Sequence, residues 1–490
     1  MGLAIDRSTF SDDEFAQAAI RQRENLHALK MLLDRPGFGK GDCSLGAEME
    51  MSLVDENAQA LPLNREILAQ TPDPNLTLEL NRFNLEYNLS PVAAMGTPFS
   101  AMQRELTDAL QSLMPIAARH GGRIIPIGIL PTLGMEHLTS GAMTDVPRYH
   151  ALVNGIKRIR QEQLHIRIDG DEPLSVDCDG ITLEGANTSF QVHLRVDPDD
   201  FANYYNAALL ATPLALAVGA NSPFLLGHSL WDETRVALFK QSVDTRGTTD
   251  HEWRRAARVP FGHGWVRKSA YELFAESCLL YPILIPVCSD EDSIAVVASG
   301  GIPELEELRL QQGTIWNWNR AVYDSSAGGH LRIEFRALPS GPTPVDMMAS
   351  AAYLVGLTVG LSKTVESLLP AFPFRYAEYN FYRAAQAGLR AELLWPALDS
   401  PSPETMAAKE LCGNLLSLAD DGLAQIGVDE AERKYLLGII RNRIQLGITP
   451  AEWQRRMLKQ HSNKTRPDAL VALVEEYLAK IDTAKPVTEW

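Results

Sequence analysis

Cysteine is scarce in this sequence, and the few cysteines form no recognisable pattern. The 490 residues include five, at positions 43, 178, 278, 288 and 412. Their number is odd, they are widely scattered, and no two form a C-x-x-C pair, so neither a disulfide framework nor a zinc knuckle is supported. We therefore expect a protein of a reducing compartment, the cytoplasm.

Positive charge and long apolar runs are also in short supply. The chain has 45 Lys and Arg against 62 Asp and Glu, a formal net charge of -17. Nucleic acids and anionic membranes are bound by basic faces, so we expect neither as a partner. The N-terminus is polar where a signal peptide would be apolar, and the most apolar stretch, Leu209 to Ala220, is too short to span a bilayer. We expect a soluble protein with small-molecule partners, and a homodimer stays open.

Several familiar catalytic motifs are missing as well. The sequence contains no Walker A pattern, no G-x-G-x-x-G after a strand, no H-E-x-x-H and no G-x-S-x-G. The usual nucleotide-binding loops, zinc proteases and serine hydrolases therefore have no support.

The segment from Leu45 to Leu53 is the most informative feature that is present. Apolar residues at the odd positions alternate with Gly46, Glu48, Glu50 and Ser52 at the even positions. This period of two predicts a strand with both carboxylates on one face. Two like charges about 7 Å apart on a strand face repel each other, so a cation is expected between them.

Four further segments repeat this arrangement of an apolar face opposite a polar one. The polar positions are Glu79 in 76–80, Glu86 in 84–89, Gln191 and His193 in 188–196, and Glu334 and Arg336 in 330–337. Any one of these faces could be the solvated side of an antiparallel sheet. Together with the first strand, however, they carry five Glu and no Lys at these positions, which favours a binding site.

Clustered carboxylates with little His and no Cys suit hard divalent ions, Mg²⁺ or Mn²⁺, which complete their coordination with phosphate oxygens and water. Phosphoryl chemistry on ATP is the leading interpretation. Arg336 lies two residues from Glu334 on the same face, where a transferring phosphoryl group would need positive charge. A simple ion pair between these two residues is the alternative.

The remaining pattern predicts mostly helix. Ser11 and Glu14 form a capping box that should open a helix ending near Leu33, and Thr97 with Pro98 should begin another. We expect a strand at 123–130 and a mobile loop at 288–301. Helices are expected at 12–33, 98–119, 148–164, 199–217, 344–365, 376–392, 404–424, 428–443, 450–460 and 467–481.

Five motifs in this order resemble the carboxylate-amine ligases of the glutamate-cysteine ligase group, in the glutamine synthetase superfamily. They are GAEMEM at 46–51, LEYNLSP at 85–91, TSFQVH at 188–193, ANSPF at 220–224 and RIEFR at 332–336. The resemblance covers roughly residues 45 to 390. It implies an α+β fold with a curved, mainly antiparallel sheet, a polar concave face and helices outside. We divide the chain into a catalytic domain at 1–390 and a helical C-terminal region at 391–490.

The same resemblance implies roles for individual residues. Glu48, Glu50, Glu79, Glu86 and Glu334 would hold two or three Mg²⁺ ions, and Arg336 would steady the transferred phosphoryl group. Many members have a metal-binding His where this chain has Gln191. Plant-type glutamate-cysteine ligases also have Gln at this position, and we assign Gln191 to the metal. Arg235 and Arg246 are similar to two family arginines expected near substrate carboxylates, Arg235 also with a catalytic role. His193, two residues after Gln191 on the same face, is expected either to bind substrate or to be a polar strand residue hydrogen-bonded to a neighbour. Asn380, Arg383 and Gly388 match a family element of unclear role.

The function implied is an ATP-dependent ligase that joins the side-chain carboxylate of glutamate to an amine through an acyl phosphate, with cysteine as the expected amine. Three alternatives remain open at this point. They are the same chemistry with another amine, a phosphotransferase similar to guanidino kinases, and a non-catalytic sensor of amino acids or nucleotides.

Overall fold

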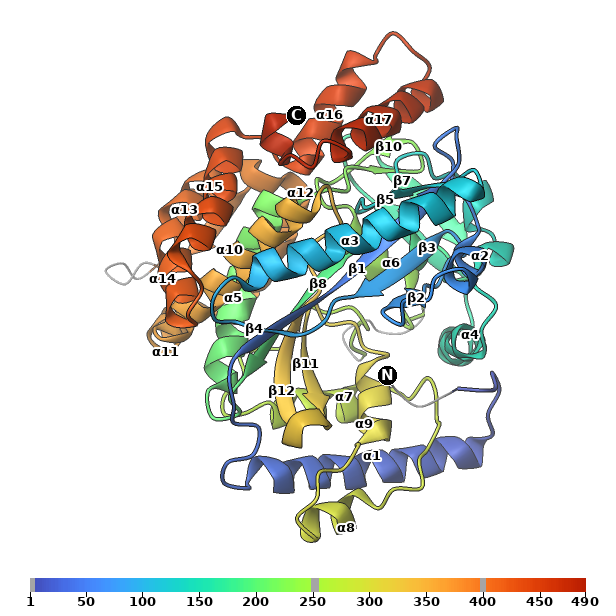
Figure 1. Ribbon diagram of the computed structural model, residues 1–490. Coiled ribbons are helices and arrows are strands. Elements are labelled where there is room, and N and C mark those ends of the chain that lie inside the picture. Colours follow the sequence, from blue (N-terminus) through green and yellow to red (C-terminus); the bar gives the residue numbers. More distant parts are fainter. Residues whose placement is uncertain (1–4, 248–254, 397–401) are drawn as a thin grey trace.

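A single antiparallel sheet organises the structure, a computed structural model that describes residues 5–247, 255–396 and 402–490 (Figure 1). Its strand order is β11-β12-β8-β1-β3-β2, with β4 and β5 also paired to β1. The strands are β1 (Ser44–Val54), β2 (Leu76–Leu78), β3 (Asn84–Asn88), β4 (Val92–Ala93), β5 (Arg123–Ile125), β8 (Phe190–Val196), β11 (Asn319–Asp324) and β12 (His330–Phe335). The expected α+β class with a curved antiparallel sheet is confirmed.

Strand β1 shows why the sheet has two different faces. Its apolar side chains from Leu45 to Leu53 are all nearly inaccessible to solvent, whereas Glu48 and Glu50 are partly accessible on the opposite face. The register pairs Glu50 with Glu86 on β3 and Glu48 with Gln191 on β8, and it pairs His193 with Glu334 on β12. Because opposed residues point to the same side of a sheet, the polar positions of four strands meet on one face.

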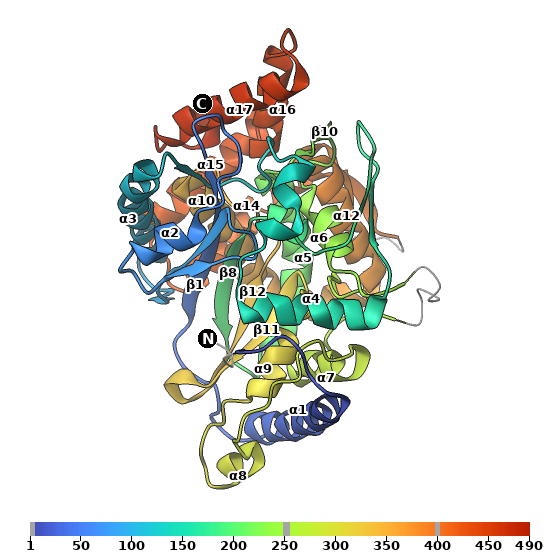
Figure 2. The same cartoon turned by 90° about the vertical axis from the view of Figure 1, so that its right-hand side faces the viewer.

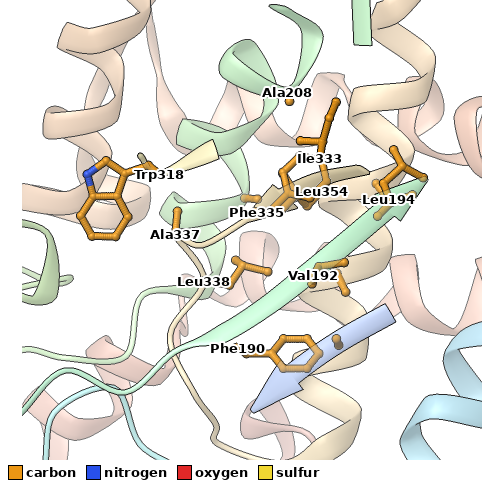
Figure 3. Packing of buried hydrophobic residues seen from close by; sticks show 14 of the residues in the cluster. Phe190, Val192, Leu194, Ala208, Trp318, Ile333, Phe335, Ala337, Leu338 and Leu354 are labelled. Carbon is orange, nitrogen blue, oxygen red and sulfur yellow. The ribbon is translucent and has the colours of Figure 1, made fainter. Parts of the chain in front are cut away.

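The apolar face of the sheet is covered by long helices. They are α3 (Pro98–Arg119), α5 (Phe201–Gly219) and α10 (Pro344–Ser362). Figure 3 shows Leu194 of β8 and Ile333 of β12 packed together with Ala208 of α5 and Leu354 of α10. Burying such residues stabilises the fold by about 1.5–3 kcal/mol for each large apolar side chain.

Helix α10 is the one helix, among the described residues, that is long and apolar enough to cross a membrane. It is not Leu209 to Ala220, the stretch identified from the sequence as the most apolar. All of its apolar window is buried inside the protein, against α5 and the C-terminal helices. Its composition is therefore that of a core helix.

The C-terminal third is largely helical and continues the same core. It contains α11 (Val365–Leu368), α12 (Phe374–Ala387), α13 (Ala408–Asn414), α14 (Leu416–Gln425), α15 (Glu430–Leu446), α16 (Pro450–Gln460) and α17 (Arg466–Ile481). Residues of α13, α14 and α15 belong to the hydrophobic cluster that includes the sheet, so this core extends across residue 390. The single helix expected at 404–424 is wrong, because residues 404–407 form β14 (Glu404–Ala407), which pairs with β13 (Glu392–Trp395) before α13 begins.

The N-terminal helix α1 (Asp12–Leu33) lies at the opposite end of the molecule from α16 and α17 (Figures 1 and 2). Its predicted capping box is present, with Ser11 and Glu14 each accepting from the other's backbone amide. It packs on α7 (Tyr271–Leu280), α8 (Ser293–Ala298) and α9 (Glu306–Gln312). Helix α8 replaces part of the loop expected at 288–301.

Two other local expectations also need correction. The strand expected at 123–130 is limited to β5, and Thr97 makes no side-chain hydrogen bond at the start of α3. The smaller elements are α2 (Asn64–Ala69), α4 (Pro147–Arg160), α6 (Arg235–Ser242), β6 (Leu164–Ile168), β7 (Leu174–Cys178), β9 (Phe224–Leu225) and β10 (His228–Ser229). All five cysteines are free.

Candidate active site

One group of polar side chains on the sheet joins β1, β8 and β12. In this histidine cluster, Glu48, His193 and Glu334 each offer a ligand atom within 4.8 Å of the others. His193 Nε2 lies 3.1 Å from Glu48 Oε1, and His193 Nδ1 is buried without a hydrogen-bond partner among the described residues. Burial alone would raise the pKa of Glu48, but the neighbouring His193 outweighs it and leaves the pKa below its ordinary value.

A second group lies at the β1–β3 end of the same face. In this carboxylate cluster, Glu50, Glu79 and Glu86 also place one oxygen each within 4.8 Å of the others. Glu86 accepts from Asn88 Nδ2 at 2.9 Å, and Glu79 accepts from the Leu80 amide at 3.0 Å. Burial, followed by the charges of Glu48 and Glu50, raises the pKa of Glu86 to about 8. Burial and the charge of Glu86 likewise raise the pKa of Glu79 well above its ordinary value.

Two arginines hold Glu334 from opposite sides. Arg320, on β11, forms a two-pronged ion pair with the carboxylate, with Nη2 at 2.9 Å from Oε1. Arg336 Nη1 lies 2.8 Å from the same oxygen. Burial would raise the pKa of Glu334, but these two guanidinium groups hold it far below its ordinary value. Glu334 is therefore ionised at any physiological pH.

One cavity of about 660 Å³ is lined by all three glutamates of the carboxylate cluster and by Glu48 of the histidine cluster. Its lining includes Arg320 and Arg336, and helix α4 contributes Arg148 and Tyr149. Glu184 also lines it, from the 3₁₀ turn Glu184–Ala186. Burial, then the charge of Glu50, raises the pKa of Glu184 to about 8. The cavity thus concentrates five carboxylates around a few guanidinium groups.

The donor atoms fit hard divalent ions. Three carboxylates of the carboxylate cluster have no ion pair with a cationic side chain among the described residues. Their raised pKa values show that their negative charge is poorly compensated by the protein alone. A set of carboxylate oxygens with a single imidazole is typical of Mg²⁺ or Mn²⁺ rather than of a thiolate-bound metal.

Comparison with known proteins agrees with this chemistry. A family model described as glutamate-cysteine ligase family 2 matches residues 44–476. The chain belongs to this family. It is 25% identical over 431 residues to a Rubrobacter xylanophilus protein provisionally named glutamate-cysteine ligase 2-3, covering 86% of this chain and 93% of that protein. This member of glutamate-cysteine ligase family 2 is therefore an ATP-dependent enzyme with glutamate-cysteine ligase-like chemistry.

A solved structure shares the fold of this family member. The glutamate-cysteine ligase of Francisella tularensis, in complex with AMP, matches with a TM-score of 0.53 at 11% identity. The match covers 92% of this chain and 93% of the other. It supports the glutamine synthetase-like sheet that the motifs implied.

Gln191 and His193 have different partners in the structure. Gln191, for which a metal role is predicted, lines the cavity; its Oε1 accepts from Arg336 Nη1 and its Nε2 donates to Glu50 Oε1 at 3.2 Å. His193, for which a substrate role is predicted, has its ring beside Glu48 and Glu334, and both roles stay predictions. Both residues point to the same face, so alternation alone could not predict their different partners, which depend on the side-chain contacts of the folded protein.

Arg235 and Arg246 do not line the cavity. Arg235 is 2% exposed, and its Nη1 donates to Glu233 Oε1 at 3.1 Å and to the Ala337 carbonyl at 3.2 Å. It lies beneath the strand end that carries Arg336. Arg246 forms a two-pronged ion pair with Asp244. The substrate roles of Arg235 and Arg246 stay predictions.

The ANSPF segment, which no periodicity explained, connects the sheet to the last helices. Gln454 Nε2 of α16 donates to Asn221 Oδ1 at 2.7 Å, and Asn221 Nδ2 donates to Tyr477 Oη of α17 at 2.9 Å. Asn221 Nδ2 also donates to the Ser340 carbonyl at 2.8 Å, and Ser340 Oγ donates to the Glu50 carbonyl at 2.6 Å. A buried chain of hydrogen bonds therefore links α16 and α17 to a residue of the carboxylate cluster.

The family element formed by Asn380, Arg383 and Gly388 also has a structural explanation. Asn380 exchanges two hydrogen bonds of 2.7 Å with the backbone of Leu394, fixing β13 against α12. Arg383 donates to Gln386 at 2.8 Å. Gly388 has φ +52°, and a Cβ there would lie 2.7 Å from Asp232 Oδ2, so no other residue fits without a shift.

Two site residues were missed from the sequence. Arg320 lies on β11, where buried Asn319, Ala321 and Tyr323 alternate with the more accessible Arg320, Val322 and Asp324 before the glycine turn to β12. That alternation was a usable signal. Glu184 lies in a short 3₁₀ turn, and a single turn carries no periodicity that could have placed it near Glu50.

Proposed function

We propose that this enzyme joins the side-chain carboxylate of glutamate to an amine, with cysteine as the leading acceptor. The observation that carries the proposal is the arrangement of Arg336 between the two acidic clusters, where it contacts Glu334 and Gln191 at once. A guanidinium fixed in this way is suited to stabilise the charge of a phosphoryl group in transfer.

In the proposed reaction the glutamate carboxylate attacks the γ-phosphoryl of ATP, giving an acyl phosphate and ADP. The amine nitrogen then attacks the acyl carbon and phosphate leaves. Divalent ions, Mg²⁺ or Mn²⁺, bound by the two clusters would neutralise charge on the phosphate oxygens. The protein's own part is to orient both substrates and to supply Arg336.

A neighbouring cavity supports placing the nucleotide at the β11–β12 side. It has a volume of about 200 Å³ and shares Arg148 and Arg320 with the main cavity. Arg309 and Arg332 also line it, so this side is rich in guanidinium groups that suit phosphate oxygens. The Francisella ligase of similar fold was solved with AMP, which agrees with a nucleotide site in this fold.

The test is a panel of acids and amines read by ADP release and product mass. ATP and glutamate without an amine should give slow ADP release or exchange of carboxylate oxygen into phosphate, because the first step needs no amine. Adding cysteine should accelerate ADP formation and yield a γ-glutamyl product. A glutamyl amide of another amine would refute cysteine while keeping the mechanism, and absence of ADP with every pair would refute the proposed substrates.

A further inference from the structure

A second hollow is formed by other segments of the chain than the acidic cavity and is lined mainly by positively charged side chains. It has a volume of about 490 Å³ and is formed by the turn between α16 and α17 together with the β9–β10 hairpin. Figure 1 shows α16 and α17 above β10, at the end of the molecule opposite α1. None of its lining residues also lines the acidic cavity.

Cationic side chains dominate the wall of this basic hollow. Arg455, Lys459, Lys464 and Arg466 line it, and Asp171 is the one acidic lining residue. His461 lines it as well, with its Nε2 2.9 Å from Glu476 Oε1. A local excess of positive charge is unexpected in a chain with a formal net charge of -17.

The two arginines are held in place by the surrounding structure. Arg466 Nη2 donates to Ser229 Oγ at 2.8 Å and to Glu172 at 2.7 Å, and its Nε donates to the Gly227 carbonyl at 2.8 Å. Arg455 Nε lies 3.0 Å from buried Asp232, and its Nη1 lies 3.0 Å from Asp171. The arginines therefore form a fixed floor that needs little reorganisation on binding.

The two lysines differ from the arginines in having no partner. Within residues 5–247, 255–396 and 402–490, neither Lys459 nor Lys464 has a side-chain hydrogen bond or ion pair. Both are exposed at the rim of the hollow. Two ammonium groups over a fixed arginine floor provide charge-assisted donors for an anion of at least two negative charges.

We propose that the basic hollow binds a small phosphate-bearing anion. Phosphate offers several acceptor oxygens and about two negative charges at neutral pH, which matches the two unpaired lysines. Phe224 and Leu458 add an apolar wall, and the volume admits an attached organic group. The ligand is thus inorganic phosphate, pyrophosphate or an organic phosphate, and this site is separate from the catalytic one.

The experiment is a calorimetric titration of the full-length chain in EDTA, which removes the divalent ions that could bring phosphate to the acidic cavity. The probes are inorganic phosphate, pyrophosphate, ribose 5-phosphate and, as a carboxylate dianion, succinate. We expect binding of at least one phosphate probe with one site per chain, weakening as salt is raised. The order among the three phosphates identifies the source of the phosphate group.

The decisive double variant, Lys459→Glu with Lys464→Glu, reverses the charge of both lysines. It should lower the affinity for the phosphate probes about tenfold or more. Lys485→Glu, at an exposed position outside the hollow, is the matched control and should bind like the parent. Steady-state turnover of the double variant should stay within about twofold of the parent, since neither lysine lines the acidic cavity. No binding of any phosphate, binding that the double variant leaves unchanged, or equal binding of succinate would each overturn the proposal.

Discussion

Replacement of Glu86 by Gln should stabilise the metal-free enzyme while abolishing its activity. Glu86 is buried beside Glu50 and Glu79, and its pKa of about 8 lies far above the ordinary 4.5. At pH 7 the folded protein therefore retains a proton that the unfolded chain releases, which favours unfolding by about 3 kcal/mol. Gln removes this contribution, and its carbonyl can still accept from Asn88 and Thr77 as Glu86 does.

The sign of the pH dependence makes this prediction specific. A carboxylate whose pKa is raised on folding costs stability as pH rises from 4.5 to about 8, because only the unfolded chain is ionised in that interval. The advantage of Glu86→Gln should therefore fall below about 1 kcal/mol at pH 5. Added Mg²⁺ should stabilise the parent more than the variant, since the variant has lost a ligand.

Urea denaturation in EDTA, at pH 5 and pH 7, measures the free energy of unfolding directly. Glu410→Gln, at an exposed position of α13, is the control and should change little. Glu334→Gln should behave in the opposite way and destabilise by about 3 kcal/mol, because the partly buried Arg320 and Arg336 lose the buried carboxylate that they share. A Glu86→Gln variant no more stable than the parent at pH 7 would refute the charge reasoning for the carboxylate cluster.

Three further predictions concern individual residues of the site. Arg336→Lys keeps the charge but loses the planar fork, so kcat should fall about ten- to a thousandfold with a smaller change in the KM for ATP; an unchanged kcat would place Arg336 outside the phosphoryl site. His193→Asn should weaken divalent-ion binding, read by titrating activity with Mg²⁺, by about tenfold or more; an unaltered Mg²⁺ dependence would exclude His193 as a ligand. Arg235→Met should lower the free energy of unfolding by about 3–5 kcal/mol, because Glu233 loses its buried partner; a raised KM for glutamate at unchanged stability would contradict this and support its substrate role.

Period-two alternation predicted much of the catalytic sheet. It located β1, β3, β8 and β12 and the face of every acidic residue on them, because burial on one side of a sheet imposes that pattern. It could not predict which residues of neighbouring strands lie opposite each other. His193 therefore joined Glu48 and Glu334 only in the folded structure, and Gln191 turned to Arg336 and Glu50.

Other features depend on contacts between segments distant in sequence. The resemblance predicts Arg235 near a substrate carboxylate; in the structure its guanidinium binds the carboxylate of Glu233, two residues away, a contact that the sequence did not predict. The pairing of Arg320 with Glu334 requires the β11–β12 hairpin. The local sequence pattern indicates which chemistry a side chain can perform, whereas its actual partner depends on the tertiary structure.

The hydrogen bonds from Gln454 and Tyr477 to Asn221, and onward to Ser340 and Glu50, have a consequence for how this enzyme is made. Glu50 leaves the ribosome long before Tyr477, and at about 5–20 residues per second tens of seconds separate them. During that time the sheet of the nascent chain lacks the two helices whose hydrogen bonds lead to β1. We therefore expect a chain that ends before α16 to be less active than the full chain, even with every acidic residue of the site in place.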